Sequence, residues 1–224
     1  MPPFDLARAL RRLKPEKRAA PLVRRADADL AFVDDASLAG PPLMLDTCVY
    51  LHVLRGKTPD KVDALLRTRT LLHSAVAIAE LANRLGARAP ANERERDARA
   101  KLARAIAEIP EHRVVTPSVV TWGEAGILAG LHARLEHDAE KWVPVFGKTS
   151  CSDNKIKRDG DSKKSHHALA GFNKGQEQDS LNDALLLVQA RAAGAIVLTE
   201  NVADFDPLQQ LVPDARVLFY RAMA

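Results

Sequence analysis

The sequence predicts an α/β fold in which a mostly parallel sheet lies between two layers of helices, a three-layer α/β/α sandwich. Short apolar runs of three or four residues recur along the chain, each beside a longer segment with a helical pattern of apolar residues. Aromatic residues make up only 4% of the chain, while alanine, leucine and arginine are plentiful, which favours helices over an all-strand sandwich. Short buried strands that alternate with helices are typical of a parallel sheet covered on both faces.

Residues 1–40 read as a basic N-terminal extension with one or two helices. The apolar patches in this segment are short, and its positive charges are Arg8, Arg11, Arg12, Lys14, Lys17, Arg18, Arg24 and Arg25. The sequence Gly40-Pro41-Pro42 then interrupts the chain. We therefore expect the compact domain to occupy residues 41–224.

The strands and helices of this domain follow in order. Strands are expected at residues 43–45, 71–74, 114–116, 195–199 and 217–220, and helices at 75–85, 119–135 and 181–193. Gly86 and Gly194 lie where helix C-caps are expected. The interleaved charges between Arg94 and Arg104 indicate a solvated, salt-bridged helix face.

Between residues 137 and 179 the apolar pattern gives way to a polar insertion. Such a stretch inside a domain is typical of a functional loop or a disordered region. Its basic residues, Lys155, Lys157, Arg158, Lys163 and Lys164, could bind RNA, or the segment could gate the site. The pair His166-His167 is typical of solvated residues in a polar loop.

Composition narrows the class of protein only broadly. A formal net charge of +4 and a pI near 9.2 suit a polyanionic partner, but they equally suit simple solubility. The two cysteines, Cys48 and Cys151, form neither a disulfide framework nor a metal-ligand spacing. No apolar run is long enough to cross a membrane, so we expect a cytoplasmic protein with no membrane partner.

Four carboxylates lie just beyond predicted strands or near the start of a predicted helix. They are Asp46, Glu80, Asp183 and Asp204. Ligand sites of open α/β sheets lie beyond the carboxyl ends of the strands, so we expect these side chains to gather there. Carboxylates placed together repel each other unless a hard cation neutralises them, and oxygen-only ligands favour Mg²⁺ or Mn²⁺. Phosphodiester hydrolysis is a chemistry that such a cation supports.

Some of these acids have structural alternatives. Asp183 follows Ser180 by three residues and could complete a capping box. Glu80 could be an ordinary exposed helix residue. Asp206 precedes Pro207, which predicts a helix N-cap, so we place it outside the site. Trp122 and Trp142 could stack on bases, but core or interface packing is the favoured interpretation.

The segments that carry these acids resemble the four sequence motifs of PIN-domain nucleases, and they are most similar to VapC-type toxins of type II toxin-antitoxin systems. The likeness covers about residues 43–220. The four segments are Leu43-Met44-Leu45-Asp46-Thr47-Cys48-Val49-Tyr50, Ser74-Ala75-Val76-Ala77-Ile78-Ala79-Glu80-Leu81, Leu181-Asn182-Asp183-Ala184-Leu185 and Leu198-Thr199-Glu200-Asn201-Val202-Ala203-Asp204-Phe205.

The resemblance implies a PIN-like fold and a metal-dependent endoribonuclease. It implies that the four acids gather around Mg²⁺ or Mn²⁺, that Thr199 and Asn201 help to arrange the site, and that Ser74 lies near the pocket. It further implies an RNA substrate, a homodimer and a cognate antitoxin. Residues 1–40 and 137–179 are longer than a minimal toxin of this kind needs.

Two other classes of function require residues that the first of these segments lacks. An aspartyl phosphatase would need a second acid two residues after Asp46, where Cys48 stands, and a dinucleotide-binding domain would need a glycine-rich turn there. The remaining alternative is a non-catalytic PIN-like module that binds RNA or a protein.

Overall fold

One parallel sheet of five strands forms the centre of the described molecule. The computed structural model describes residues 4–136 and 174–223, and it gives only the backbone of Glu136 and of residues 174–178. The strands are β1 (Leu43–Leu45), β2 (Leu71–Ser74), β3 (Val114–Val115), β4 (Ile196–Thr199) and β5 (Arg216–Phe219). Their order in the sheet is β3-β2-β1-β4-β5. The predicted α/β class with a parallel sheet is confirmed.

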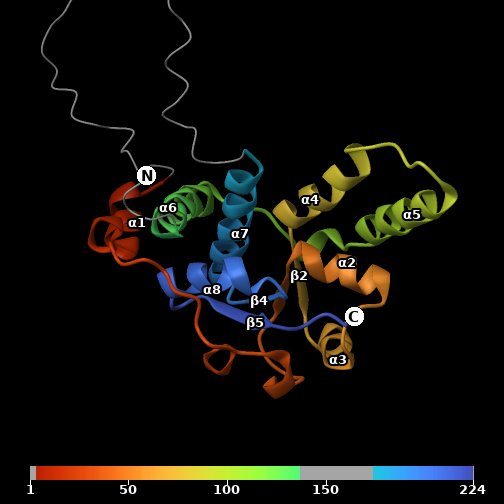
Figure 1. Cartoon of the computed structure of the whole chain (residues 1–224), viewed down its shortest axis with the longest axis horizontal. Coiled ribbons are helices and arrows are strands. Elements are labelled where there is room, and N and C mark those ends of the chain that lie inside the picture. The colour runs from red at the N-terminus through yellow and green to blue at the C-terminus, as the bar shows by residue number, and fades with distance from the viewer. Residues whose placement is uncertain (1–3, 137–173, 224) are drawn as a thin grey trace, which may run out of the picture.

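Helices cover both faces of this sheet, which completes the three-layer sandwich (Figure 1). The helices are α1 (Leu6–Leu13), α2 (Thr47–Arg55), α3 (Asp60–Thr68), α4 (Ala75–Gly86), α5 (Glu93–Ala107), α6 (Val119–Glu136), α7 (Lys174–Ala192) and α8 (Val202–Leu211). In Figure 1 the helices α1, α6, α7 and α8 lie to the left of the sheet, and α2 to α5 lie to its right. The architecture is consistent with a PIN-like sandwich.

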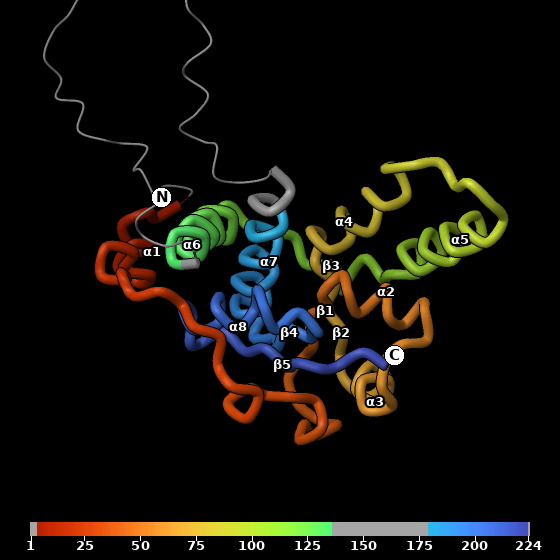
Figure 2. The backbone as a smooth tube through the Cα atoms, viewed as in Figure 1, coloured from red at the N-terminus to blue at the C-terminus, as the bar shows by residue number. Residues whose placement is uncertain are grey.

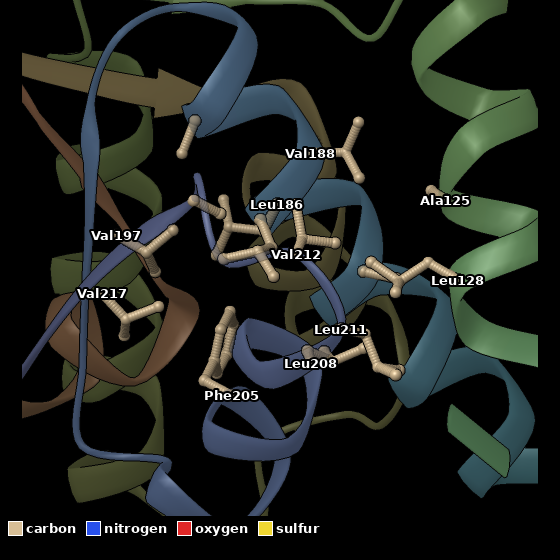
Figure 3. Packing of buried hydrophobic residues seen from close by; sticks show 14 of the residues in the cluster. Ala125, Leu128, Leu186, Val188, Val197, Phe205, Leu208, Leu211, Val212 and Val217 are labelled. Carbon is tan, nitrogen blue, oxygen red and sulfur yellow. The ribbon is translucent and has the colours of Figure 1, made fainter. Parts of the chain in front are cut away.

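Two apolar clusters form because successive strand residues point to opposite faces. Met44 and Val197 point into the cluster with α6, α7 and α8, whereas Leu45 and Leu198 point into the cluster with α2 to α5. Figure 3 shows the first cluster, in which Phe205 of α8 lies below the strand residues Val197 and Val217. Both faces of the central strands are therefore buried.

The N-terminal segment lies along the outside of the sandwich (Figure 2). Helix α1 packs against α6, and Leu13 and Leu30 join the cluster on that side. Further along, Phe32 forms an isolated parallel bridge with Phe219 of the edge strand β5, and the amide of Phe219 donates to the carbonyl of Ala31 at 2.8 Å. This segment therefore covers one edge of the sheet, which would otherwise expose unpaired backbone groups.

Most predicted elements lie within a residue or two of their observed bounds, and two predictions at helix ends were wrong. Helix α7 begins at Lys174 and not near residue 181, so the predicted insertion ends earlier, and residues 137–173 lie outside the described residues. Helix α4 continues through Gly86 to a C-cap at Ala87. Gly194 does follow a helix with a positive φ of 65°, as a C-terminal glycine should.

No helix within residues 4–136 and 174–223 is long and apolar enough to cross a bilayer.

Candidate active site

The strand order places the predicted acids at one end of the sheet. The chain runs outward from β1 to β2 and β3, then returns to form β4 on the other side of β1. Ligand sites of such sheets lie beyond the carboxyl ends of the strands at this reversal. Asp46 directly follows β1, and Thr199 ends β4, so these two residues lie on either side of the reversal.

Asp46 is a buried carboxylate held by two neighbours. Its Oδ2 accepts a hydrogen bond from Thr199 Oγ1 at 2.6 Å and another from Cys48 Sγ at 3.0 Å. Burial nevertheless raises the pKa of Asp46, because the hydrogen bonds only partly replace the lost water. Thr199 is fully buried, so it fixes the orientation of this carboxylate.

Glu80 reaches the same region from α4. One of its oxygens accepts from the Thr47 hydroxyl, and the other accepts from Asn182 Nδ2 at 2.5 Å. Burial raises the pKa of Glu80, and the charge of Asp46 adds to this rise. Glu80 is therefore not an ordinary solvated helix residue.

Asp183 interacts electrostatically with the other three acids of the site. It accepts no hydrogen bond within the described residues, and it is inside α7, nine residues after the helix begins, so the capping-box interpretation is wrong. Burial raises the pKa of its carboxyl well above the ordinary range, and the charges of Asp46, Asp204 and Glu80 raise it further. Such a carboxylate lacks compensation for its charge.

Asp204 lies in the first turn of α8, where Asn201 holds it. Asn201 caps the helix by accepting from the amide of Asp204 at 3.3 Å, and its Nδ2 donates to Asp204 Oδ2 at 2.6 Å. The amide of Asn201 in turn donates to Thr199 Oγ1 at 2.9 Å. Thr199 and Asn201 thus connect the loop after β4 to two of the four acids.

The donor chemistry of these residues fits a hard divalent cation, whereas their spacing is not that of a formed metal site. Burial and mutual repulsion disfavour the charged forms of Asp46, Glu80 and Asp183, and a cation would relieve this. Within residues 4–136 and 174–223, however, no three His, Cys, Asp or Glu side chains are arranged to hold a metal ion. A bound cation would therefore require these carboxylates to draw together.

Several neutral residues of the site were not predicted from the sequence. Thr47 and Asn182 hold Glu80, and Cys48 holds Asp46. Each is adjacent to a predicted acid or one residue further along the chain, which is the one sequence signal they carry. Burial and the neighbouring Asp46 raise the pKa of the Cys48 thiol, so it stays protonated and can donate.

A second unpredicted group connects α2 to the loop after β4. His52 Nε2 lies 3.1 Å from Glu200 Oε1, and His52 Nδ1 lies 2.9 Å from the Tyr220 hydroxyl. The amide of Tyr220 donates to the carbonyl of Thr199 at 3.1 Å. These contacts fix the loop that carries Thr199 and Asn201 against the helix that follows Asp46.

Three further residues singled out in the sequence are Ser74, Asp206 and Trp122, and the structure shows where each of them lies. Ser74 is buried, caps α4 and donates to Gln189 at 2.6 Å. Asp206 is inside α8 and fully buried, where it pairs with Arg25 at 2.6 Å, so its predicted role as N-cap was wrong and belongs to Asn201. Trp122 is 48% exposed and is not a core residue. The predictions for Trp142, for His166-His167 and for the basic residues between Lys155 and Lys164 lie outside the described residues.

Comparisons with known proteins add little to this geometry. No protein-family model matches the chain, and no curated protein matches it. Among solved structures, one similar chain belongs to VapBC2 from Rickettsia felis bound to a DNA fragment from its promoter, at 15% identity and a TM-score of 0.44 over 80% of this chain and 99% of that one. At this identity and TM-score the similarity shows nothing about the function of this chain. The function proposed below therefore rests on the residues of the site.

Proposed function

We propose that this chain is a Mg²⁺- or Mn²⁺-dependent endoribonuclease of the PIN type, with Asp46, Glu80, Asp183 and Asp204 as its acidic centre. The observation that supports it best is the state of Asp183. This carboxylate has no hydrogen-bond donor among the described residues, and burial together with the charges of Asp46, Asp204, Glu80 and Asp179 raises its pKa. Uncompensated charge of this kind is typical of functional sites.

The residues of the chain divide the work of such a site. A divalent cation held by the acids would polarise a phosphodiester and orient a water molecule for attack. Thr199 keeps Asp46 in one orientation, and Thr47 and Asn182 do the same for Glu80. Asn201 keeps Asp204 at the start of α8. Pre-oriented carboxylates reduce the reorganisation that the reaction would otherwise require.

A cell-level role follows from the sequence resemblance alone. We infer that the protein is the toxin of a toxin-antitoxin pair, that it binds a cognate antitoxin and that it acts as a homodimer. Induced expression of the wild-type chain in bacteria should then arrest growth, and expression of Asp46→Asn should not. Growth arrest of equal depth by both chains would contradict the toxin role.

The test of the nuclease uses purified full-length protein and a mixed RNA substrate, with Mg²⁺ or Mn²⁺ and with a chelator. Asp46→Asn and Asp183→Asn should each abolish metal-dependent cleavage. Asp60→Asn is the matched control, since Asp60 is an exposed acid in the first turn of α3. Cleavage that persists equally in all variants would indicate a contaminating nuclease.

A non-catalytic module that binds RNA or a protein is the second candidate. The absence of a formed metal-binding group among the described residues favours it. It predicts that Asp46→Asn retains the biological effect while charge reversals in basic segments remove it. The nuclease predicts the opposite response for Asp46→Asn.

A further inference from the structure

A groove of about 810 Å³ lies between α2, α4 and α5, away from the four acids. In Figure 1 these three helices lie together to the right of the sheet. The groove is lined by the last turn of α2, the end of α4 and one face of α5. No candidate acid of the active site lines it, so it is a separate feature of the surface.

The walls of this groove carry a strong excess of positive charge. Arg88 and Glu95 both line the groove and pair with each other at 2.9 Å. Asp97 is the other acid of the lining, and it forms no ion pair within the described residues. Six further exposed cations line the groove and form no salt bridge within the described part of the chain: Arg55, Lys57, Arg84, Arg94, Arg99 and Lys101. The groove therefore presents unpaired cations to solvent.

The floor of the groove is apolar and belongs to the protein core. Leu102 is buried, and Leu51, Leu54 and Leu85 pack against the same cluster. Because these leucines pack against the core, the cations on the walls are the groups of the groove that are most available to a ligand. Among the described residues no aromatic side chain lines the groove, so they provide no platform for base stacking there.

Two of the helices that line the groove, α2 and α4, also position acidic residues of the candidate active site. Glu80 and Arg84 are four residues apart on α4, hence on one face and about 6 Å apart along its axis. Helix α2 begins directly after Asp46, and Arg55 ends it about 13 Å further along. Along α2 and along α4, the acidic residue of the site therefore comes first and a cation of the groove follows it.

We propose that this groove binds the phosphodiester backbone of single-stranded RNA on one side of the cleavage position. The inference rests on the proposed nuclease function, which places a phosphodiester at the acidic centre. A strand that leaves that centre along α2 and α4 meets cations spaced along its path. An acidic peptide would also satisfy the cations, but it would have no reason to extend from the carboxylate cluster. Binding through phosphates alone tolerates any base sequence.

The test measures the affinity of the full-length chain for a labelled single-stranded RNA in the presence of a chelator, so that no metal-dependent cleavage occurs. Each phosphate contact contributes about −0.7 to the slope of log affinity against log salt. The pair Arg84→Ala with Lys101→Ala should therefore reduce the slope by about 1.4 and weaken binding about tenfold at low salt.

The matched control is the pair Arg96→Ala with Arg104→Ala. Both residues are exposed cations on α5 that do not line the groove, so the change in net charge is the same. This pair should change affinity less than about twofold. Equal losses in both pairs would overturn the proposal, because they would reflect net charge alone. If the groove pair failed to fold, Arg84→Gln and Lys101→Gln alone should each reduce the slope by about 0.7.

Labelled polyglutamate, measured in the same way, distinguishes the other class of ligand. If the groove pair loses affinity for polyglutamate but binds RNA as the wild type does, the groove is a peptide site and the proposal is wrong. The nuclease proposal is tested separately, by cleavage in Mg²⁺ or Mn²⁺. A chain that binds RNA through the groove and cleaves nothing would overturn the nuclease and leave the groove assignment standing.

Discussion

At the scale of single residues, the carboxyl of Asp183 has a different pKa in the folded and in the unfolded chain. In the unfolded chain its carboxyl titrates near its ordinary value of 3.8. In the folded protein, burial and the neighbouring acids raise this pKa well above that value. The folded state therefore binds a proton that the unfolded state has released over the interval between the two values. Stability is thus lost as pH rises through the folded pKa, and it returns as pH falls.

Replacement of Asp183 by asparagine should stabilise the metal-free protein. At pH 8 in a chelator, Asp183→Asn should melt at a higher temperature than the wild type, by about 2–4 °C for each kcal/mol of unfolding free energy gained. This advantage should shrink as pH falls toward 4, because the wild-type carboxyl then becomes protonated. Thermal melts across this pH range measure it.

Added metal provides the control for the same variant. Mg²⁺ or Mn²⁺ should raise the melting temperature of the wild type by mass action and leave Asp183→Asn nearly unchanged. A variant that is less stable than the wild type at pH 8 in the chelator would show that Asp183 carries a stabilising contact instead.

At the scale of helices and strands, the sequence predicts most of what positions the site. Buried parallel strands are nearly continuous apolar runs, so segments such as 43–45 and 196–199 are visible without any partner. The acids after them follow from the position of ligand sites in such sheets. The neutral residues that hold these acids cannot be predicted in the same way, because Asn182 and Thr47 have no local pattern that distinguishes them from the other polar residues of the chain.

Two predicted signals of helix N-termini were wrong for the same physical reason. Ser180 and Asp183 match a capping box, and Asp206 before Pro207 matches an N-cap, but both signals are local. Helix α7 begins six residues before Ser180, and Asp206 pairs with Arg25, which lies 181 residues earlier. A single sequence shows no sign of such a pairing.

The N-cap of α8 should matter for both stability and activity. Asn201→Ala removes the cap and the hydrogen bond to Asp204, so it should cost about 1 kcal/mol of unfolding free energy and also reduce metal-dependent cleavage. Asn92→Ala is the matched control, because Asn92 caps α5 by accepting from the amide of Glu95 at 2.9 Å. It should cost a similar free energy and leave cleavage unchanged. Equal cleavage by both variants would remove Asn201 from the proposed site.

At the scale of the whole molecule, the N-terminal segment is connected to the sandwich by ion pairs and hydrogen bonds as well as by apolar packing. Arg134 donates to the carbonyl of Arg18 at 2.8 Å, and Arg18 donates to the carbonyl of Leu211 at 3.1 Å. Arg25 contacts the fully buried Asp206, with its backbone amide 2.8 Å from one carboxylate oxygen and its Nε 2.6 Å from the other. The negative charge of Asp206 in α8 is therefore stabilised by contacts with the N-terminal segment and not by water.

Removal of Arg25 should therefore destabilise the entire fold and not just the N-terminal segment. Asp206 is 0% exposed, so Arg25→Ala leaves a buried carboxylate without its ion-pair partner, at a cost of about 3 kcal/mol in denaturant unfolding. Arg24→Ala is the control, since Arg24 and Asp27 are both exposed, and it should change stability little. The double variant Arg25→Ala with Asp206→Asn should recover much of the loss, because it removes the unpaired charge along with its partner. No recovery would mean that the packing of the Arg25 side chain, and not the charge of Asp206, connects the segment to α8.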